Sequence, residues 1–241
     1  MLIKSRAIVL HSLKFGDSQL IVDLLTAQVG RVSFICRLPS SRKSRIKKPF
    51  FQPLSILNIE FDHRQNLKLQ KFKNVAVAEP FASIPFDSYK LSISLFLAEF
   101  LAYATRGEQQ DILLYNYIEN SMLWLDGTRR SFSNFHLVFT MRLSRFIGFY
   151  PNLEDYEEGD FFDLRSGIFC KMPPLHPDFI PPAEASRIVL LMRMNYESMH
   201  LFRMSREERN RCVEWILTYY RLHIPNFPVL KSVAVLRELF S

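Results

Sequence analysis

Residues 31–61 read RVSFICRLPSSRKSRIKKPFFQPLSILNIEF, two alternating apolar patterns separated by a basic run. Val32, Phe34 and Cys36 alternate with polar or charged residues before the run, and residues 57–61 repeat the alternation after it. Alternation with a period of two is typical of half-buried β-strands. The stretch therefore predicts two strands of a small sheet joined by a strongly basic connection.

Further strands are predicted on both sides of this stretch. Residues 3–13 are rich in Ile, Val and Leu and end at a turn signal, and residues 20–26 alternate in the same way. A fifth strand starts at Leu67, and its apolar phase shifts across Gln70 and Lys71, which indicates a bulge of the kind that barrel closure uses. Five short strands favour a small closed barrel, and the oligonucleotide-binding (OB) fold has that strand count.

Beyond residue 87 the apolar period changes to three and four residues, which predicts helices. An acidic, proline-rich insertion at residues 150–182 interrupts them, with a short hairpin expected at 161–169. The predicted fold is α+β and multidomain, with a five-stranded OB-fold barrel at residues 1–80 and an all-helical domain at 81–241 that contains the irregular insertion. Helices are expected at residues 88–104, 112–125, 134–147, 183–199, 205–222 and 229–240, with Ser205 and Glu208 forming a capping box.

The positive charge of the chain belongs to the predicted barrel. The formal net charge is +7, but residues 1–80 hold 14 Lys and Arg against 5 Asp and Glu, and residues 81–241 hold 17 against 19. Because unpaired charges are costly to bury, a basic run must lie in water or against an anion. It is either a solvated loop or a phosphate-binding element, with nucleic acid as the first candidate partner and an anionic membrane surface as the second. The cations of the run are Arg37, Arg42, Lys43, Arg45, Lys47 and Lys48.

Phe is common in the chain, at 22 residues, and at alternating positions it is typical of a core. Phe50 and Phe51 follow the basic run directly, so they are the candidates for stacking against unstacked bases. Core packing is the other role open to them.

No motif for catalysis, a cofactor or a metal is found. The chain has no glycine-rich nucleotide loop, its six His follow no metal-ligand spacing, and its three Cys are far apart. The acidic residues at 154–160 lack the spacing and the central Gly of a calcium loop. No cofactor is therefore expected, and an enzyme with a site assembled from distant residues is the weakest hypothesis. The Cys usage, the absence of a signal-like start and the short apolar runs predict a soluble cytoplasmic protein.

Several short segments carry a further signal. They are AIVL (7–10), FGDSQLIVDLLT (15–26), GRV (30–32), SRKS (41–44), FQPL (51–54), EFL (99–101) and LKS (230–232). In this order they resemble the RecO family of bacterial recombination and DNA-repair mediators. The similarity extends over nearly the full length of the chain.

The resemblance implies a non-catalytic role, located in the cytoplasm at the nucleoid. RecO-like proteins bind single- and double-stranded DNA, anneal complementary strands, and work with RecR to load the RecA recombinase. They also bind the acidic C-terminal tail of single-strand-binding protein, for which Arg142 and Arg145 on an aromatic helix and Lys231 are the candidates here. A non-catalytic protein-interaction scaffold that binds an acidic partner is the alternative.

The chain also departs from the family pattern. Many members carry two Cys-x-x-Cys pairs in the insertion, and the corresponding positions here are Tyr156, Gly159, Cys170 and Pro173. Because one thiolate cannot hold a tetrahedral zinc ion, no metal is predicted, and packing is expected to hold the insertion together. The Gly-Ala before the family's basic turn is replaced by residues 38–39, Leu-Pro.

Overall fold

The computed structural model describes residues 1–37, 46–107 and 110–239. The chain divides into two compact units. The first unit comprises Met1–Gly127 together with Leu230–Leu239, and the second comprises Thr128–Val229. None of the helices in the described ranges is both long enough and apolar enough to cross a membrane.

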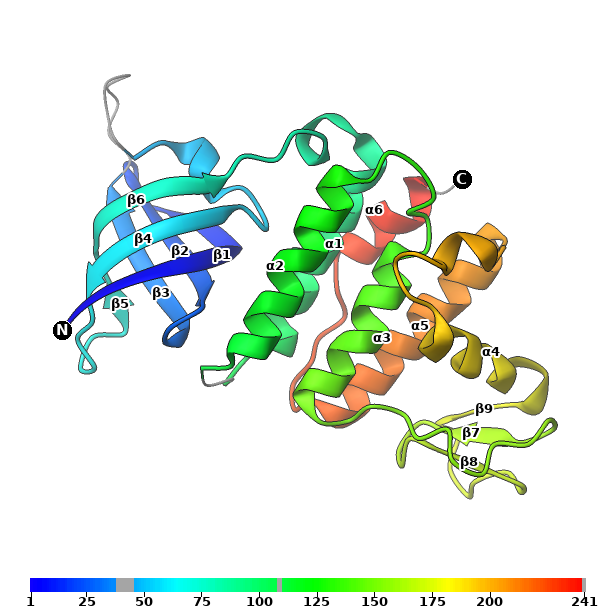
Figure 1. Ribbon diagram of the computed structural model, residues 1–241. Helices are drawn as coiled ribbons and strands as arrows, with labels where there is room; N and C mark the ends of the chain where they lie inside the picture. The colour runs from blue at the N-terminus through cyan, green and yellow to red at the C-terminus, as the bar shows by residue number, and fades with distance from the viewer. Residues whose placement is uncertain (38–45, 108–109, 240–241) are drawn as a thin grey trace. The chain divides into compact units, whose positions relative to one another are not determined.

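The first unit begins with a closed barrel (Figure 1). Its sheet has the strand order β5-β3-β2-β1-β4-β6. β5 pairs in parallel with β3 at one edge of the sheet, β6 pairs antiparallel with β4 at the other, and only Lys71 separates β5 from β6. The fifth predicted strand therefore joins both edges, which closes the five-stranded OB fold. The strands are β1 (Leu2–Phe15), β2 (Gln19–Thr26), β3 (Gly30–Arg37), β4 (Ile56–Asp62), β5 (Leu69–Gln70) and β6 (Phe72–Glu79).

The predicted irregularity in the fifth strand is confirmed. The strand breaks at Lys71, and the pairing of β4 with β6 shifts by one residue between Glu60 and Phe61. The break turns Phe72 into the barrel, where its ring stacks on that of Phe34 with 4.2 Å between the centroids. The phase shift in the sequence thus marks the point at which the strand changes neighbours.

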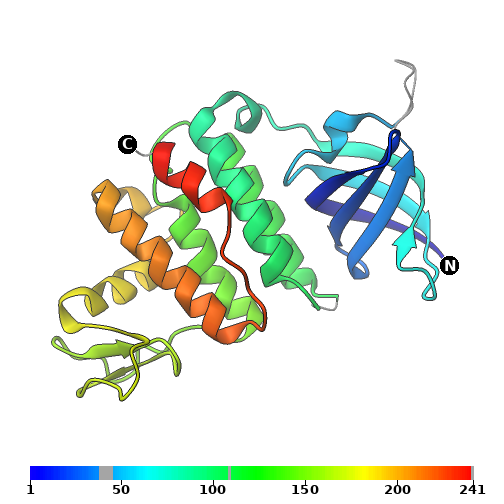
Figure 2. The same cartoon turned by 180° about the vertical axis from the view of Figure 1, so that it is seen from behind.

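Three helices complete the first unit: α1 (Ser88–Ala104), α2 (Ile112–Gly127) and α6 (Ser232–Leu239). Asp87 caps α1, because its carboxylate accepts hydrogen bonds from the backbone N–H groups of Tyr89 and Lys90. Most of α1 is buried, as its apolar faces predict, and α6 packs against it (Figure 2). The C-terminal helix therefore belongs to the same unit as the barrel.

The second unit is built on α3 (Phe135–Ile147), which packs against α4 (Pro182–Arg193) and α5 (Arg206–His223). The Ser205–Glu208 capping box of α5 is confirmed. The Ser205 hydroxyl accepts a hydrogen bond from the Glu208 backbone N–H, and the Glu208 carboxylate accepts one from the Ser205 backbone N–H. The helix predicted at 183–199 is too long, because Met194 adopts an extended backbone that ends α4. A separate short 3₁₀ turn, η3 (Met199–Leu201), follows.

Residues 150–182 are less irregular than the sequence predicts. β7 (Phe161–Asp163) and β8 (Ile168–Cys170) form the expected hairpin, and β9 (Phe179–Ile180) adds a third strand beside β7. Gly167 closes the hairpin turn at φ +70°, and a Cβ there would lie 2.5 Å from the Tyr219 hydroxyl. The sequence does not predict β9, because two residues are too few to show an alternating pattern.

Candidate nucleic-acid interface

The described residues of the basic run lie at one end of the barrel. Arg37 is the last residue of β3, and its side chain is exposed. Lys47 and Lys48 are exposed where the described chain resumes, at the start of the 3₁₀ turn η1 (Lys48–Phe51). Pro49 favours this turn because its fixed φ suits a first helical position. Arg42, Lys43 and Arg45 lie outside the described residues.

Strand register places an aromatic side chain near Arg37. Phe15 of β1 pairs with Gln19 of β2, and Gln19 pairs with Arg37 of β3. Residues opposite one another in a ladder share a face of the sheet, so these three side chains form one row. The Phe15 side chain is 52% exposed, and its neighbour Lys14 is exposed as well.

A hydrogen bond connects the η1 turn to β1. The Ser12 hydroxyl donates to the backbone carbonyl of Phe51 at 3.2 Å. The η1 turn, which begins at Lys48, thus packs against the same strand that carries Lys14 and Phe15. The basic rim is defined as Lys14, Phe15, Arg37, Lys47 and Lys48.

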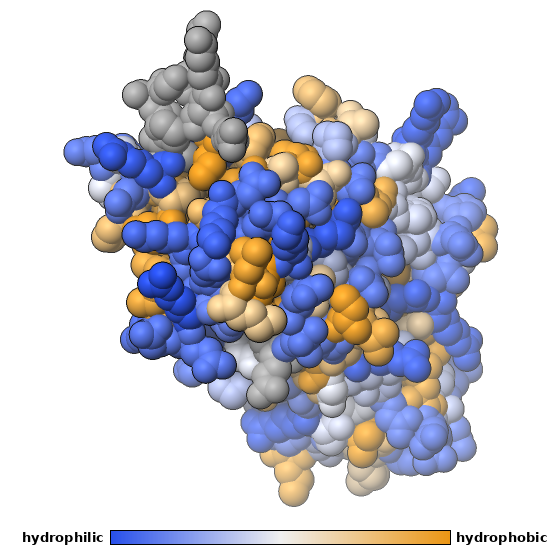
Figure 3. All heavy atoms as spheres, turned by 60° about the vertical axis from the view of Figure 1, so that its left-hand side comes forward, coloured by the Kyte–Doolittle hydropathy of each residue, from blue (hydrophilic) through white to orange (hydrophobic). Residues whose placement is uncertain are grey.

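The cations of the basic rim are not paired with carboxylates, unlike several other cations on the barrel surface. Lys4 pairs with Glu60 at 2.9 Å and Lys73 with Asp62 at 2.8 Å. Within the described ranges, no ion pair includes a cation of the basic rim. Hydrophilic side chains dominate the barrel face that Figure 3 brings forward, with apolar atoms between them. The rim therefore offers uncompensated positive charge beside an exposed aromatic ring.

Phe51 is a core residue and not an exposed stacking face. Phe51 is 2% exposed and its ring stacks on Phe72 inside the barrel, with 5.8 Å between the centroids. Phe50 is partly buried against the same core. The exposed aromatic ring of the rim is Phe15, which sequence adjacency to the basic run does not reveal. Only the pairing of three strands brings Phe15 to Arg37.

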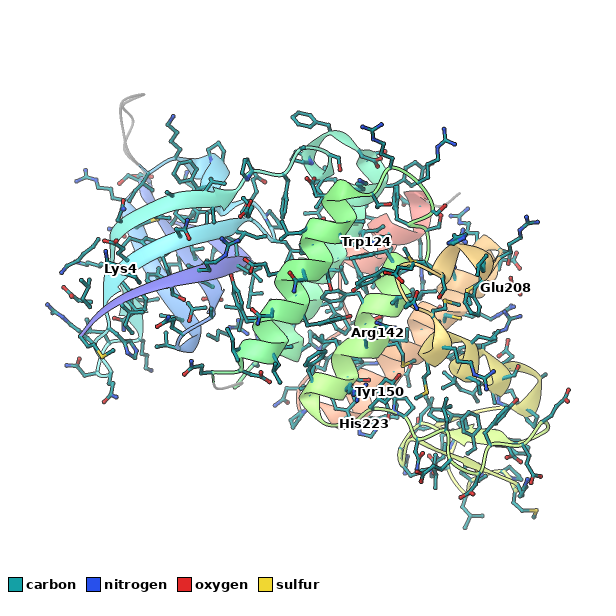
Figure 4. All side chains as sticks on the ribbon, in the orientation of Figure 1. Lys4, Trp124, Arg142, Tyr150, Glu208 and His223 are labelled. Atoms are coloured by element: carbon teal, nitrogen blue, oxygen red, sulfur yellow. The ribbon has the colours of Figure 1, made fainter. Side chains whose placement is uncertain are left out.

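The three residues predicted to bind a protein partner fall into different units. Arg142 and Arg145 lie on α3 in the second unit, and Lys231 lies in the first. The Arg142 guanidinium donates to the backbone carbonyl of Met194 at 3.1 Å, so it stabilises the end of α4 (Figure 4). Arg145 is exposed, as is the Lys231 side chain.

Two segments that carried the family resemblance meet in the first unit. The Glu99 carboxylate of α1 accepts hydrogen bonds from the backbone N–H groups of Lys231 and Ser232, at 3.0 and 2.8 Å, and from the Ser232 hydroxyl. Burial alone would raise the pKa of Glu99, but the hydrogen bonds from Ser232 and Lys231 outweigh it and lower the pKa. Glu99 therefore caps α6 as a carboxylate, and this explains the Leu-Lys-Ser segment in structural terms.

The insertion does not fit a zinc ion. Of the four positions that correspond to the family's ligands, only Cys170 has a metal-binding side chain, and burial raises the pKa of its thiol. The described residues contain no group of three or more His, Cys, Asp or Glu side chains that is arranged to hold a metal ion. Instead, the insertion is held by side-chain contacts. The ring centroids of Tyr156 and Phe169 are 4.5 Å apart. Lys171 forms ion pairs with Glu157 and, at 3.3 Å, with the buried Asp160.

Metal removal is therefore expected to leave the insertion folded. A chelator should not change the thermal unfolding midpoint, whereas Tyr156→Ala should lower the free energy of unfolding by about 1–2 kcal/mol through loss of its aromatic contact. Differential scanning calorimetry of the parent with and without the chelator measures the first effect, and calorimetry of the Tyr156→Ala variant beside the parent measures the second. Stoichiometric zinc in the purified protein would contradict this expectation.

Comparison with known proteins covers the whole chain. A family model described as "Recombination protein O N terminal" matches residues 1–81, and one described as "Recombination protein O C terminal" matches residues 85–232. The chain is 55% identical over 241 residues to "DNA repair protein RecO" of Phocaeicola vulgatus, with 100% of both chains covered. It is 52% identical over 242 residues to the protein of the same name from Bacteroides fragilis strain YCH46, and 32% identical over 243 residues to that from Flavobacterium psychrophilum, again with 100% of both chains covered.

Proposed function

This chain belongs to the RecO family, and on that premise we propose that it acts in DNA repair by binding DNA through the basic rim and the basic run of its barrel. It binds single- and double-stranded DNA, anneals complementary strands and helps load RecA together with RecR. The role is that of a non-catalytic mediator, in which the chain holds DNA and partner proteins rather than changing a covalent bond.

The observation that carries this proposal is the uncompensated charge of the basic rim. Its cations have no ion-pair partner among the described residues, and they lie in the part of the chain, residues 1–80, whose net charge is +9. Lys and Arg in this state bind backbone phosphates irrespective of base sequence. Phe15 adds an exposed aromatic face of the kind that single-stranded nucleic acid stacks on.

A second part of the proposal concerns protein partners. Single-strand-binding protein carries the acidic tail that the resemblance implies as a ligand. Arg145 in the second unit and Lys231 in the first are separate exposed candidates for binding this tail. Arg142 contributes by fixing the end of α4, through its bond to Met194. RecR is the other proposed partner.

Binding of single-stranded DNA across a salt series tests the proposal. Each phosphate contact contributes about −0.7 to the slope of log affinity against log salt concentration, so six contacts give a slope of about −4. Fluorescence anisotropy with labelled strands of two unrelated sequences measures both the slope and its independence of sequence. An affinity that stays flat between low and high salt would exclude phosphate contacts as the basis of binding.

A further inference from the structure

A groove of about 550 Å³ lies beside the basic rim in the first unit. Its walls come from the η1 turn, the end of β6, the following segment with the 3₁₀ turn η2 (Ile84–Phe86), and the start of α1. Phe50, Phe81 and several prolines line it, with Leu91 of α1 at its edge. The groove therefore has flat, largely apolar walls, and it is separate from the exposed Phe15 row.

One polar group in this groove lacks a partner. The Ser94 side chain is 1% exposed and lines the groove, and its hydroxyl makes no hydrogen bond within the described ranges. Two other buried serines in helices of this unit donate to the preceding turn, Ser92 to the Ser88 carbonyl at 2.8 Å and Ser121 to the Tyr117 carbonyl at 2.6 Å. An unmade buried hydrogen bond is costly, so a ligand whose polar edge reaches the Ser94 hydroxyl would gain a hydrogen bond that the described residues do not supply.

The charges around the groove favour an anionic ligand. Lys47 and Lys48 directly precede the groove residues Pro49 and Phe50 in the chain, and both lysines are exposed. The acidic residue of the groove is Glu79, which pairs with Arg6 at 3.3 Å. A chain of phosphates held by the lysines would thus meet no uncompensated negative charge at the groove edge.

We propose that this groove binds an unstacked nucleobase of single-stranded DNA, whose neighbouring phosphates lie on Lys47 and Lys48. This rests on the proposed function and adds to it a specific place for a base. A nucleobase has a flat face for the aromatic and proline walls and a polar edge for the Ser94 hydroxyl. An apolar side chain of a protein partner would fill the walls but leave Ser94 without a partner.

Paired oligonucleotides test this inference. One is an ordinary single strand, and the other has the same length and phosphates but carries abasic sites throughout. Phe81→Ala is expected to weaken binding of the ordinary strand about tenfold, within the range for loss of one base-stacking contact, and to leave the abasic strand unchanged. Phe86→Ala is the matched control, because Phe86 is 85% exposed in the same segment but does not line the groove.

A second pair of variants covers the case in which Phe81→Ala does not fold. Leu91→Glu places a charge at the edge of the groove, and Leu113→Glu places the same charge on α2, away from it; the two leucines are 40% and 67% exposed. The ratio of affinities for ordinary and abasic strands removes the general charge effect. This ratio should fall about tenfold in Leu91→Glu and stay at the parent value in Leu113→Glu.

The outcomes separate the inference from the proposed function. The groove variants could lose the same affinity for ordinary and abasic strands, or lose no affinity for either. Both results would overturn the base-binding groove, while the salt dependence of the parent would still support DNA binding. Parent protein that binds neither strand in a salt-dependent way would contradict the proposed function itself.

Discussion

Single-stranded DNA is expected to bind at least a hundredfold more weakly at about 0.2 M salt when all six cations of the basic run are replaced by alanine. The loss follows from counterion release, because six lost phosphate contacts make the slope of log affinity against log salt concentration about 4 less negative. Fluorescence anisotropy of the variant and the parent across the same salt series measures the affinity and the slope together. The replaced residues are Arg37, Arg42, Lys43, Arg45, Lys47 and Lys48.

A matched pair of double variants distinguishes contacts from overall charge. Lys47→Ala with Lys48→Ala should make the slope about 1.4 less negative, which is the contribution of two contacts on a single strand. Lys4→Ala with Lys73→Ala removes the same charge from the barrel, but these lysines are already paired with Glu60 and Asp62. The control slope should therefore stay close to that of the parent.

Replacing Arg37, Lys47 and Lys48 with alanine should leave the fold unaffected, because these side chains are exposed and form no ion pair within the described ranges. An unchanged thermal unfolding midpoint checks this directly. If the six-residue variant is folded and binds DNA as tightly as the parent, the phosphate contacts lie elsewhere on the protein. Equal slopes for the two double variants would indicate that net charge, rather than the basic rim, determines binding.

Much of the fold can be predicted because its signals are local. The alternation at Val32, Phe34 and Cys36 reflects one buried face of β3, and the phase shift across Gln70 and Lys71 marks the break between β5 and β6. Helix starts are also local, as the Ser205 capping box shows. The prediction fails where tertiary contacts decide the local structure. Met194 ends α4 although the apolar pattern continues, and its carbonyl there accepts a hydrogen bond from Arg142.

The candidate site could be predicted only where it depends on composition. The charge of residues 37–48 is visible in the sequence, whereas the row from Phe15 to Arg37 depends on the register of three strands. Register is decided by the buried faces of all three strands together, so no single segment specifies it. Phe51 shows the converse, since its position beside the basic run suggests an interface and its side chain is in the core. The division into compact units, with α6 beside α1, also depends on a distant contact, the capping of α6 by Glu99.

Asp126→Ala is expected to lower the free energy of unfolding of the first unit by about 3 kcal/mol or more, because it removes several hydrogen bonds to a charged acceptor. The Asp126 carboxylate accepts from the backbone N–H groups of Ala82, Ser83 and Ile84 at 2.8, 2.8 and 2.9 Å. The buried Lys90 ammonium donates to the Ser83 hydroxyl at 2.6 Å and to the Asp126 carbonyl at 3.2 Å. This network fixes the segment between β6 and α1 to the end of α2.

Asp111→Ala is the matched control for this substitution. Asp111 caps the start of α2 by accepting from the backbone N–H groups of Leu113 and Leu114, at 2.8 and 3.0 Å. Loss of a helix cap costs about 1 kcal/mol, so the control should be clearly the milder variant. The chain has two tryptophans, Trp124 in the first unit and Trp215 in the second. A Trp215→Phe background therefore makes the fluorescence of Trp124 report urea unfolding of the first unit.

The effect of Asp126→Ala should also depend on pH. Burial alone would raise the pKa of Asp126, but hydrogen bonds from the backbone of residues 82–84 outweigh it, so its pKa in the folded protein lies below the ordinary value of an aspartate. A carboxylate with a lowered pKa stabilises the fold fully above its unfolded pKa and loses this contribution as the pH falls through the folded value. The gap in unfolding free energy between parent and variant should therefore be constant near neutral pH and narrow below about pH 4. A gap that persists unchanged into the acid range would mean that Asp126 acts through packing, and that the segment before α1 is not held by its charge.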